Sequence, residues 1–326
     1  MRRARKSATA MLELLASSLD KSLIERLRRA FFGPPVLYWL GVFVTMAWFC
    51  PGFLTGLGHR FAARALLFLG GLSPGGNPPL SEPQVLLAAA FVLLFVSAWL
   101  SELVRGWIYR LLEGYLWPLR IFHWGAGNWR RGKAAWEKRL EQLWEQRLEQ
   151  LRKRLWEQQG TDLSLEQEWG QLDARVRRLP PDEAIMPTAF GNVLSAAENY
   201  VRRRYGLDPV VVWPHIWFLL SDERREIESQ RRALDAAVDG VFFSLLFLPW
   251  GFFCPLAFVA GSAAAWLAYR LAVERAALFG ELVRAVFDLH RLRLYDSLGC
   301  PRPLPKEERE RGRRLTQFLW RGHPGC

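Results

Sequence analysis

The stretch that decides the fold is ALDAAVDGVFFSLLFLPWGFFCPLAFVAGSAAAWLAYR, residues 233–270. It is almost wholly apolar, and a helix needs about 20 apolar residues to cross the hydrocarbon of a bilayer. Two such helices fit if the chain folds back at Pro249–Gly251, since proline lacks the amide donor that a helix interior requires. We therefore predict a transmembrane hairpin over residues 233–272. The alternative is a single span from Val241 to Tyr269, kinked at its prolines.

Charge on both sides of this stretch favours the hairpin. The segment before residue 233 and the tail after residue 270 are both rich in arginine. Basic flanks remain on the cytoplasmic side of a membrane, and a single span would place one of them outside. Gly261 and Ala265 are spaced as in helices that approach each other closely through small residues, which an alanine-rich span also explains.

Two carboxylates enter the hairpin at its expected cytoplasmic mouth. Asp235 and Asp239 lie one turn apart on one helix face. An acid inside a membrane segment is energetically costly and often functional. We therefore take both as candidate polar or pore residues of the membrane region. The alternatives are that they are solvated at the mouth or paired with Arg231 or Arg232.

A second hairpin is expected over residues 34–105, with spans at about 36–57 and 84–104. Between the spans only Arg60, Arg64 and Glu82 are charged, which favours an extracytoplasmic loop. Residues 61–72 are apolar but too short to span, so we interpret them as interfacial or re-entrant.

Net charge and tryptophan content agree with a membrane location. The 326 residues carry a formal net charge of +12 and 16 Trp, many of them beside apolar blocks. Interfacial tryptophan, cytoplasmic arginine and attraction to anionic headgroups account for both numbers, so we expect no nucleic-acid partner.

The sequence thus predicts an all-α, polytopic integral membrane protein with about four transmembrane helices in two hairpins. A basic amphipathic arm (1–33), a cytoplasmic helical domain (106–232) and a cytoplasmic helical tail (273–326) complete it. The expected location is the plasma (inner) membrane, multi-pass, with both termini cytoplasmic. The arm is expected either to lie on the inner leaflet or to pack on the cytoplasmic domain.

Residues 129–159 form a long amphipathic helix in this prediction. Its apolar side chains fall within a sector of about 140° on a helical projection. They are Trp136, Leu140, Leu143, Trp144, Leu148, Leu151 and Leu155. This face either packs on its own domain or is a self-association face.

Several local signals place the remaining cytoplasmic helices. Thr188 is expected to cap a helix that ends before Gly206. Residues 210–213 are expected to be extended, because Pro214 disfavours helix at the residue before it. One helix should continue from the hairpin to about residue 298, with His290 solvated on it, and residues 306–320 should form another.

No catalytic motif, metal-ligand spacing or cofactor fingerprint is present in the sequence. Cys50 and Cys254 would both lie near the outer face, so a disulfide between them is an alternative to buried free thiols. Asn192, Glu198, Tyr200 and residues 202–204 offer a weak polar site, for which a helix–helix contact is the favoured interpretation.

Two segments, Pro187–Leu220 and Tyr269–Leu298, carry a resemblance through the stretches GNVLSAAENYVRRRYGLDPVVVWPHIWFLL and YRLAVERAALFGELVRAVFDLHRLRLYDSLG. They resemble parts of a group of multi-pass bacterial membrane proteins. The resemblance, which covers about one fifth of the chain, implies a bacterial plasma membrane protein whose cytoplasmic helical segment precedes a transmembrane hairpin. It implies no activity, and no site residue is carried over.

Three functions follow as hypotheses. The first is a membrane-anchored helical scaffold or interaction platform that forms a homo-oligomer or docks a cytoplasmic protein partner. The second is an oligomeric channel or transporter with Asp235 and Asp239 near its cytoplasmic mouth. The third, a membrane enzyme, has the least support because no catalytic motif is present.

Overall fold

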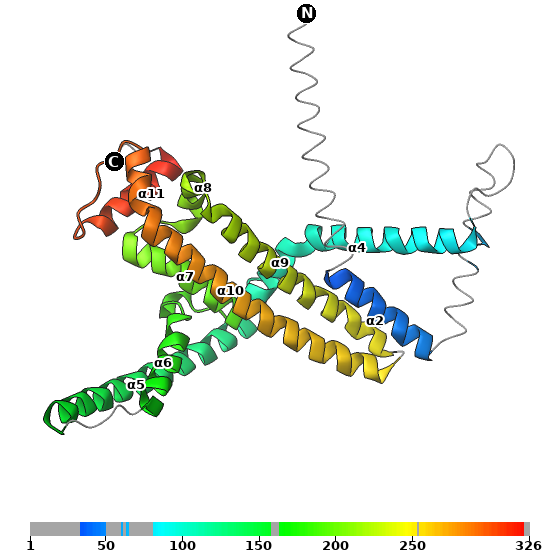
Figure 1. Ribbon diagram of the computed structural model, residues 1–326, viewed down its shortest axis with the longest axis horizontal. Helices are drawn as coiled ribbons and strands as arrows, with labels where there is room; N and C mark the ends of the chain where they lie inside the picture. The colour runs from blue at the N-terminus through cyan, green and yellow to red at the C-terminus, as the bar shows by residue number, and fades with distance from the viewer. Residues whose placement is uncertain are drawn as a thin grey trace, which may run out of the picture. The chain divides into compact units, whose positions relative to one another are not determined.

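The computed structural model describes residues 33–49, 60, 63–64, 81–157, 163–252 and 254–322 of the chain. Within those ranges the protein is all-α, with nine α-helices and no strands, as the sequence predicts. In chain order the elements are α2 (Pro34–Phe49), α4 (Glu82–Glu113), α5 (Leu119–Glu157), α6 (Leu163–Arg177), the 3₁₀ turn η1 (Asp182–Ala184), α7 (Ala189–Tyr205), α8 (Pro209–Leu219), α9 (Glu223–Phe247), the 3₁₀ turn η2 (Leu248–Phe252), α10 (Pro255–Ser297) and α11 (Glu308–Arg321) (Figure 1).

The helices divide into two compact units. Unit 1 comprises residues 1–108 and 235–270, and unit 2 comprises residues 109–234 and 271–326. Helices α4, α9 and α10 each continue from one unit into the other, so the two units share three unbroken helices.

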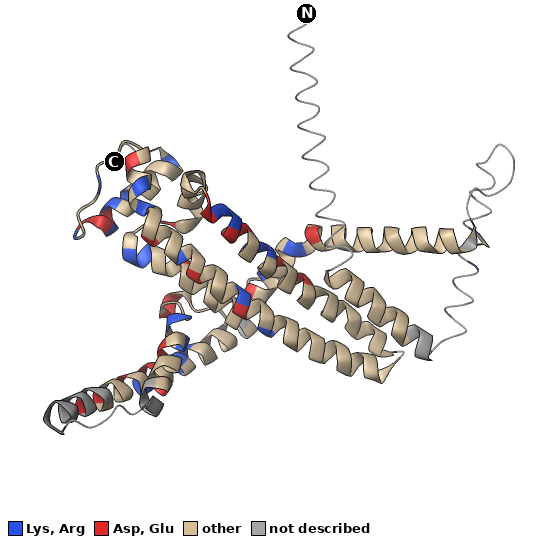
Figure 2. Ribbon diagram, in the orientation of Figure 1, with Lys and Arg blue, Asp and Glu red and all other residues tan. Residues whose placement is uncertain are grey.

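Among the described residues, three helical segments are long and apolar enough to cross a membrane: Pro83–Glu113, Glu223–Phe252 and Pro255–Ser297. Charged residues are absent from α2 and from the ends of α9 and α10 that meet at η2 (Figure 2). Large apolar side chains on these helices, such as Leu87 (71%) and Trp266 (60%), are exposed. In water such surfaces are unfavourable, whereas lipid solvates them. These helices give the chain the character of a multi-pass membrane protein.

The chain folds back between α9 and α10. A Cβ added at Gly240 of α9 would lie 3.7 Å from the Cβ of Ala268 on α10, and one added at Gly261 would lie 3.1 Å from Leu248 Cδ2. The partner on one helix thus moves back along its sequence as the other advances, so the end of α9 and the start of α10 run antiparallel at close range (Figure 1). The predicted fold-back at residues 249–251 is confirmed, and the single kinked helix is wrong.

Helix α2 packs within unit 1 through aromatic side chains. The ring of Tyr38 lies 5.6 Å from that of Phe243 on α9, and its hydroxyl accepts a hydrogen bond of 3.2 Å from Trp250 Nε1. Trp39 Nε1 donates to Ser97 Oγ of α4 at 2.8 Å. Helix α2 is shorter than a full span, and residues 50–57 of the predicted first span lie outside the described residues.

Unit 2 has a tightly packed apolar core. Phe287 of α10, with Val212 and Ile216 of α8, is fully buried, and Leu315 of α11 is 1% exposed. Each fully buried aliphatic or aromatic side chain contributes about 1.5–3 kcal/mol of transfer free energy. The core therefore binds α7, α8 and α11 to the unit 2 part of α10.

Helix α7 begins and ends as its sequence predicts. The Thr188 hydroxyl accepts a hydrogen bond of 3.0 Å from Gly191 N, and Gly206 ends the helix with a left-handed φ of 71°. Gly206 also lies against α11, where an added Cβ would be 1.8 Å from Arg309 O. On the α11 side of the same contact, a Cβ added at Gly312 would be 1.9 Å from Tyr205 O. Glycine at both positions lets the two backbones meet.

The prediction of an extended segment at residues 210–213 is wrong, because these residues belong to α8. Asp208 caps that helix by accepting a hydrogen bond of 2.9 Å from Val210 N, and Pro209 occupies its first turn, where proline is tolerated. Pro214 lies inside the helix at a cost. The cap and the complete burial of Val212 and Ile216 outweigh that cost.

Some of the other local predictions are confirmed, and others are corrected or lie outside the described residues. The continuation of α10 to Ser297 and the C-terminal helix α11 are confirmed, and the helix predicted at 129–159 begins earlier, at Leu119. Cys254 is a buried free thiol, as the default expectation held, whereas Cys300 is disulfide-bonded. Cys50 and residues 1–32 lie outside the described part of the chain, as do residues 61–72 apart from 63 and 64.

Candidate functional site

The predicted polar residues of the membrane region meet an arginine. Arg105 of α4 donates from Nη2 to Asp239 Oδ2 at 2.7 Å and from Nε to Oδ1 at 3.1 Å. Asp235 Oδ2 lies 3.8 Å from Arg105 Nη1. The structure thus brings together both acids named from the sequence, with a partner that the sequence did not indicate. Pairing with Arg231 or Arg232 is one of the alternatives that the sequence leaves open.

This cluster is largely shielded from solvent. The side chains of Arg105, Asp235 and Asp239 are 15%, 18% and 9% exposed, respectively. A guanidinium that binds a carboxylate through two parallel hydrogen bonds is among the strongest side-chain pairs. Chemically, the arrangement holds α4 to α9 and neutralises a carboxylate within a membrane-length helix.

A cleft of about 940 Å³ opens in unit 2 between α5, α6, α7 and α10. Its wall carries five basic side chains: Lys133, Arg177, Arg203, Arg204 and Arg284. Glu137, Glu281 and Asp288 are the acidic residues on the same wall. The cleft thus brings eight charged side chains to the wall of one cavity.

Two of the five cations are paired with acids. Lys133 Nζ lies 2.6 Å from Asp182 Oδ1, and Arg177 Nε lies 2.7 Å from Asp173 Oδ2. The Lys133 ammonium and its hydrogen bond hold the pKa of the Asp182 carboxyl below its ordinary value. The charges of Lys133 and Arg177 are therefore largely neutralised within the protein.

Arg203, Arg204 and Arg284 differ, because no carboxylate of the described residues lies at ion-pair distance from them. Arg204 and Arg284 instead stack on Tyr200, with their Cζ atoms 5.5 and 5.3 Å from the ring centroid. Cation–π contacts orient a guanidinium without neutralising its charge. Three arginines therefore line the cleft without a direct carboxylate partner among the described residues, although Glu281 and Asp288 on the same wall act electrostatically on Arg284, and Asp288 also on Arg204.

The acid at the base of the cleft is engaged by phenols. Tyr200 donates to Asp288 Oδ1 and Oδ2 at 3.2 Å each, and Tyr205 donates to Oδ1. Burial and the hydrogen bond to Asp288 raise the pKa of the Tyr205 phenol. Asp288 is thus held by two neutral donors.

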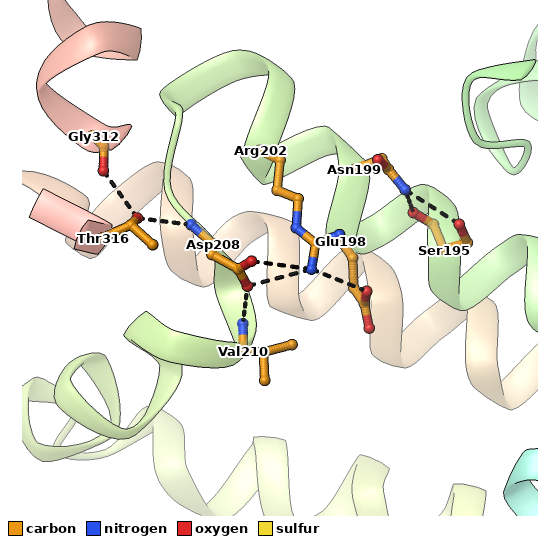
Figure 3. Close-up of polar contacts among 8 residues, drawn as sticks. All are labelled: Ser195, Glu198, Asn199, Arg202, Asp208, Val210, Gly312 and Thr316. Carbon is orange, nitrogen blue, oxygen red and sulfur yellow. Dashed lines mark hydrogen bonds and ion pairs between the residues drawn. The ribbon is translucent and has the colours of Figure 1, made fainter. Parts of the chain in front are cut away.

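A second polar network joins α7, α8 and α11 (Figure 3). Arg202 Nη2 lies 3.2 Å from Asp208 Oδ2 and 3.8 Å from Glu198 Oε2, and Asp208 N donates to Thr316 Oγ1 at 3.1 Å. Thr316 in turn donates to Gly312 O at 2.9 Å. Burial raises the pKa of the Glu198 carboxyl. The network fixes the turn between α7 and α8 against α11, which is a structural task.

The structure places the residues of the weak polar site predicted around residues 192–204 in three different environments. Asn192 is fully buried, where it accepts from Met186 N at 2.8 Å and donates to Met186 O at 3.0 Å, so it does not face a site. Glu198 and Arg202 belong to the network above, and Tyr200, Arg203 and Arg204 line the cleft. Sequence reasoning missed Arg284, since only the fold brings α10 beside α7.

His290 corrects another prediction. It is 4% exposed, not solvated, and its Nε2 lies 3.5 Å from Glu223 Oε1. The sequence places it as one polar residue on an amphipathic helix, whereas the fold brings Glu223, the first residue of α9, against its ring. Among the described residues no group of three His, Cys, Asp or Glu side chains is placed to hold a metal ion.

The predicted apolar face of α5 is partly covered by α6. Leu143 is 1% exposed, while Trp144 is 48% exposed and its ring lies 6.3 Å from that of Trp169 on α6. Trp136 and Leu140 are half-buried. The side chains of Leu148, Leu151 and Leu155 are outside the described set.

Comparison with known proteins yields no relative: no family model, no curated protein and no solved structure matches the chain.

Proposed function

We propose that this protein is a membrane-anchored helical platform that self-associates or docks a cytoplasmic protein partner. The observation that carries the proposal is the continuity of α9 and α10, each of which joins an apolar segment of unit 1 to a segment of unit 2 that carries charged residues. Unit 1 then serves as the anchor, and unit 2 presents the chemistry.

In this proposal unit 1 crosses the plasma (inner) membrane four times. Residues 36–57 supply the first span and the three long apolar segments supply the others. An even number of spans leaves both termini and unit 2 in the cytoplasm, where arginine-rich segments are retained.

The ion pair in unit 1 supports anchoring over transport. Asp239, one of the two acids expected at a pore mouth, is bound at two points by Arg105. The channel or transporter alternative makes a distinct prediction: ion flux in liposomes that Asp239→Ala abolishes. Absence of flux agrees with the anchoring role.

Self-association is proposed to use the outer part of the α5 face, around the half-exposed Trp144. The test is a mass measurement of the full chain in lipid nanodiscs over a range of protein-to-nanodisc ratios. We expect a defined oligomer for the wild type and a monomer for Trp144→Glu.

Gln142→Glu is the matched control, because it adds the same charge two residues away at an exposed position. It should leave the oligomer intact, and circular dichroism should show equal helix content in both variants. A wild-type chain that is monomeric at every ratio would contradict self-association through this face.

A further inference from the structure

The cleft of unit 2 has the dimensions of a ligand site. Its volume of about 940 Å³ lies at the upper end of the roughly 300–1,000 Å³ typical of small-molecule pockets. Its lining comes from four helices and the turn after α6, all of them within one compact unit. The size is ample for a ligand larger than a single inorganic anion.

The three arginines without an ion pair line one cleft. Arg203 and Arg204 lie in the last turn of α7, where cations interact favourably with the helix dipole. Arg284 lies in the interior of the 43-residue helix α10, beside the C-terminus of α6. Glu281 acts electrostatically on Arg284, and Asp288 on both Arg204 and Arg284, but no carboxylate of the described residues forms an ion pair with these arginines. An anion in the cleft can supply the direct partner that they lack.

Arg284 is also held in an oriented but incomplete hydrogen-bonding state. Its Nη2 donates to Arg177 O at 3.2 Å, its guanidinium stacks on Tyr200, and its Nε is buried without a hydrogen-bond partner. A planar guanidinium fixed in this way presents its remaining donors in a constant direction. Arginine forks bind phosphate and carboxylate oxygens through paired hydrogen bonds.

We propose that this cleft binds a ligand through a phosphate group that carries at least two negative charges, with Arg203, Arg204 and Arg284 as its ligating side chains. Three guanidinium groups match a phosphomonoester or a diphosphate better than a single carboxylate, because phosphate offers enough oxygens to accept hydrogen bonds from all three. The phosphate can belong to a soluble phosphate ester or to a phosphomonoester lipid headgroup. This site is independent of the proposed self-association.

The test uses the full chain in nanodiscs of phosphatidylcholine, with inorganic pyrophosphate as the soluble probe in calorimetric titration. We expect saturable binding with one site per chain. Each lost charge-assisted hydrogen bond is worth about 1.5–3 kcal/mol, so Arg284→Gln should weaken binding by about tenfold or more. Arg203→Gln, at an exposed position where folding is not at risk, should weaken it similarly.

The lipid source has its own arm. Wild type and Arg284→Gln are each released from nanodiscs that contain phosphatidic acid, and native mass spectrometry measures the lipid that remains bound. We expect the wild type to retain phosphatidic acid and Arg284→Gln to lose it. Arg313→Gln is the matched control for both arms, because Arg313 lies on α11, apart from the cleft-lining residues, and should change neither result.

Three outcomes overturn the proposal: neither pyrophosphate nor phosphatidic acid binds, Arg313→Gln weakens binding as much as Arg284→Gln, or a polyglutamate peptide binds while both phosphate probes fail. The last would assign the cleft to an acidic protein segment. Oligomeric state does not enter these readouts, so their failure is distinguishable from failure of the platform function.

Discussion

Arg105 on α4 and Asp239 on α9 are 134 positions apart in sequence and are joined by two hydrogen bonds of 2.7 and 3.1 Å. The pair connects α4, which precedes residues 114–222 of unit 2, to α9, which follows them. A buried pair of this kind adds modest net stability when complete, but removal of one partner leaves an uncompensated charge.

Arg105→Leu should therefore destabilise the protein by about 3–5 kcal/mol, because Asp239 then remains charged without its partner. Asp239→Leu should lower the stability by a similar amount, because it leaves the Arg105 guanidinium without its bidentate carboxylate partner. The measurement is thermal unfolding in detergent, followed by circular dichroism.

The double variant Arg105→Leu/Asp239→Leu is the control for that prediction. It removes both charges and should recover most of the lost stability. Single variants that melt like the wild type would show that the pair does not hold α4 to α9.

The contact between α7 and α11 makes a second prediction. A Cβ at Gly312 would lie 1.9 Å from Tyr205 O, so Gly312→Ala must push two backbones apart. We expect a loss of about 1–3 kcal/mol, as for overpacked cores. Gly170→Ala on α6 is the matched control, since nothing lies within 4 Å of its added Cβ. It should be neutral or stabilising by up to about 1 kcal/mol.

The pair of Lys133 and Asp182 predicts a pH dependence. The lowered pKa of Asp182 means that the folded state favours the carboxylate, so the pair adds stability above the ordinary carboxyl pKa near 3.8. That stability is lost as pH falls through the lower folded pKa. Because the Asp182 side chain is 72% exposed, the effect should stay below about 1 kcal/mol.

The measurement for this pair is the difference in melting temperature between wild type and Asp182→Asn. It should be constant above about pH 5 and disappear in strong acid. Glu183→Gln, at the neighbouring position, should show no comparable change. If the difference in melting temperature between wild type and Asp182→Asn grew in acid, the pH dependence would have the opposite sign and would contradict the pairing.

Much of the fold follows from local sequence signals. Apolar blocks longer than a bilayer crossing predict the long helices, Thr188 and Gly206 predict the limits of α7, and the prolines predict the reversal at η2. These features depend on residues close in sequence. The same reasoning was wrong for α8, where burial of Val212 and Ile216 outweighs the effect of Pro214.

The candidate sites were less accessible to sequence reasoning. Asp235 and Asp239 stood out as acids in an apolar segment, but their partner Arg105 is distant in sequence. The cleft combines α7 and α10, and no local pattern distinguishes Arg284 from other basic residues on α10. Pairings between helices depend on tertiary packing, which a single sequence does not encode in any short window.

The central claim is that lipid surrounds unit 1 and that the charged segments of unit 2 lie together on one side. The most direct measurement is the location of sandwich fusions of green fluorescent protein and alkaline phosphatase at Gly170 and Lys306, with Ser81 as the opposite reference. We predict fluorescence without phosphatase activity at Gly170 and Lys306, and phosphatase activity at Ser81. Gly170 and Lys306 on opposite sides of the membrane, or a chain that stays dispersed without detergent, would contradict the account.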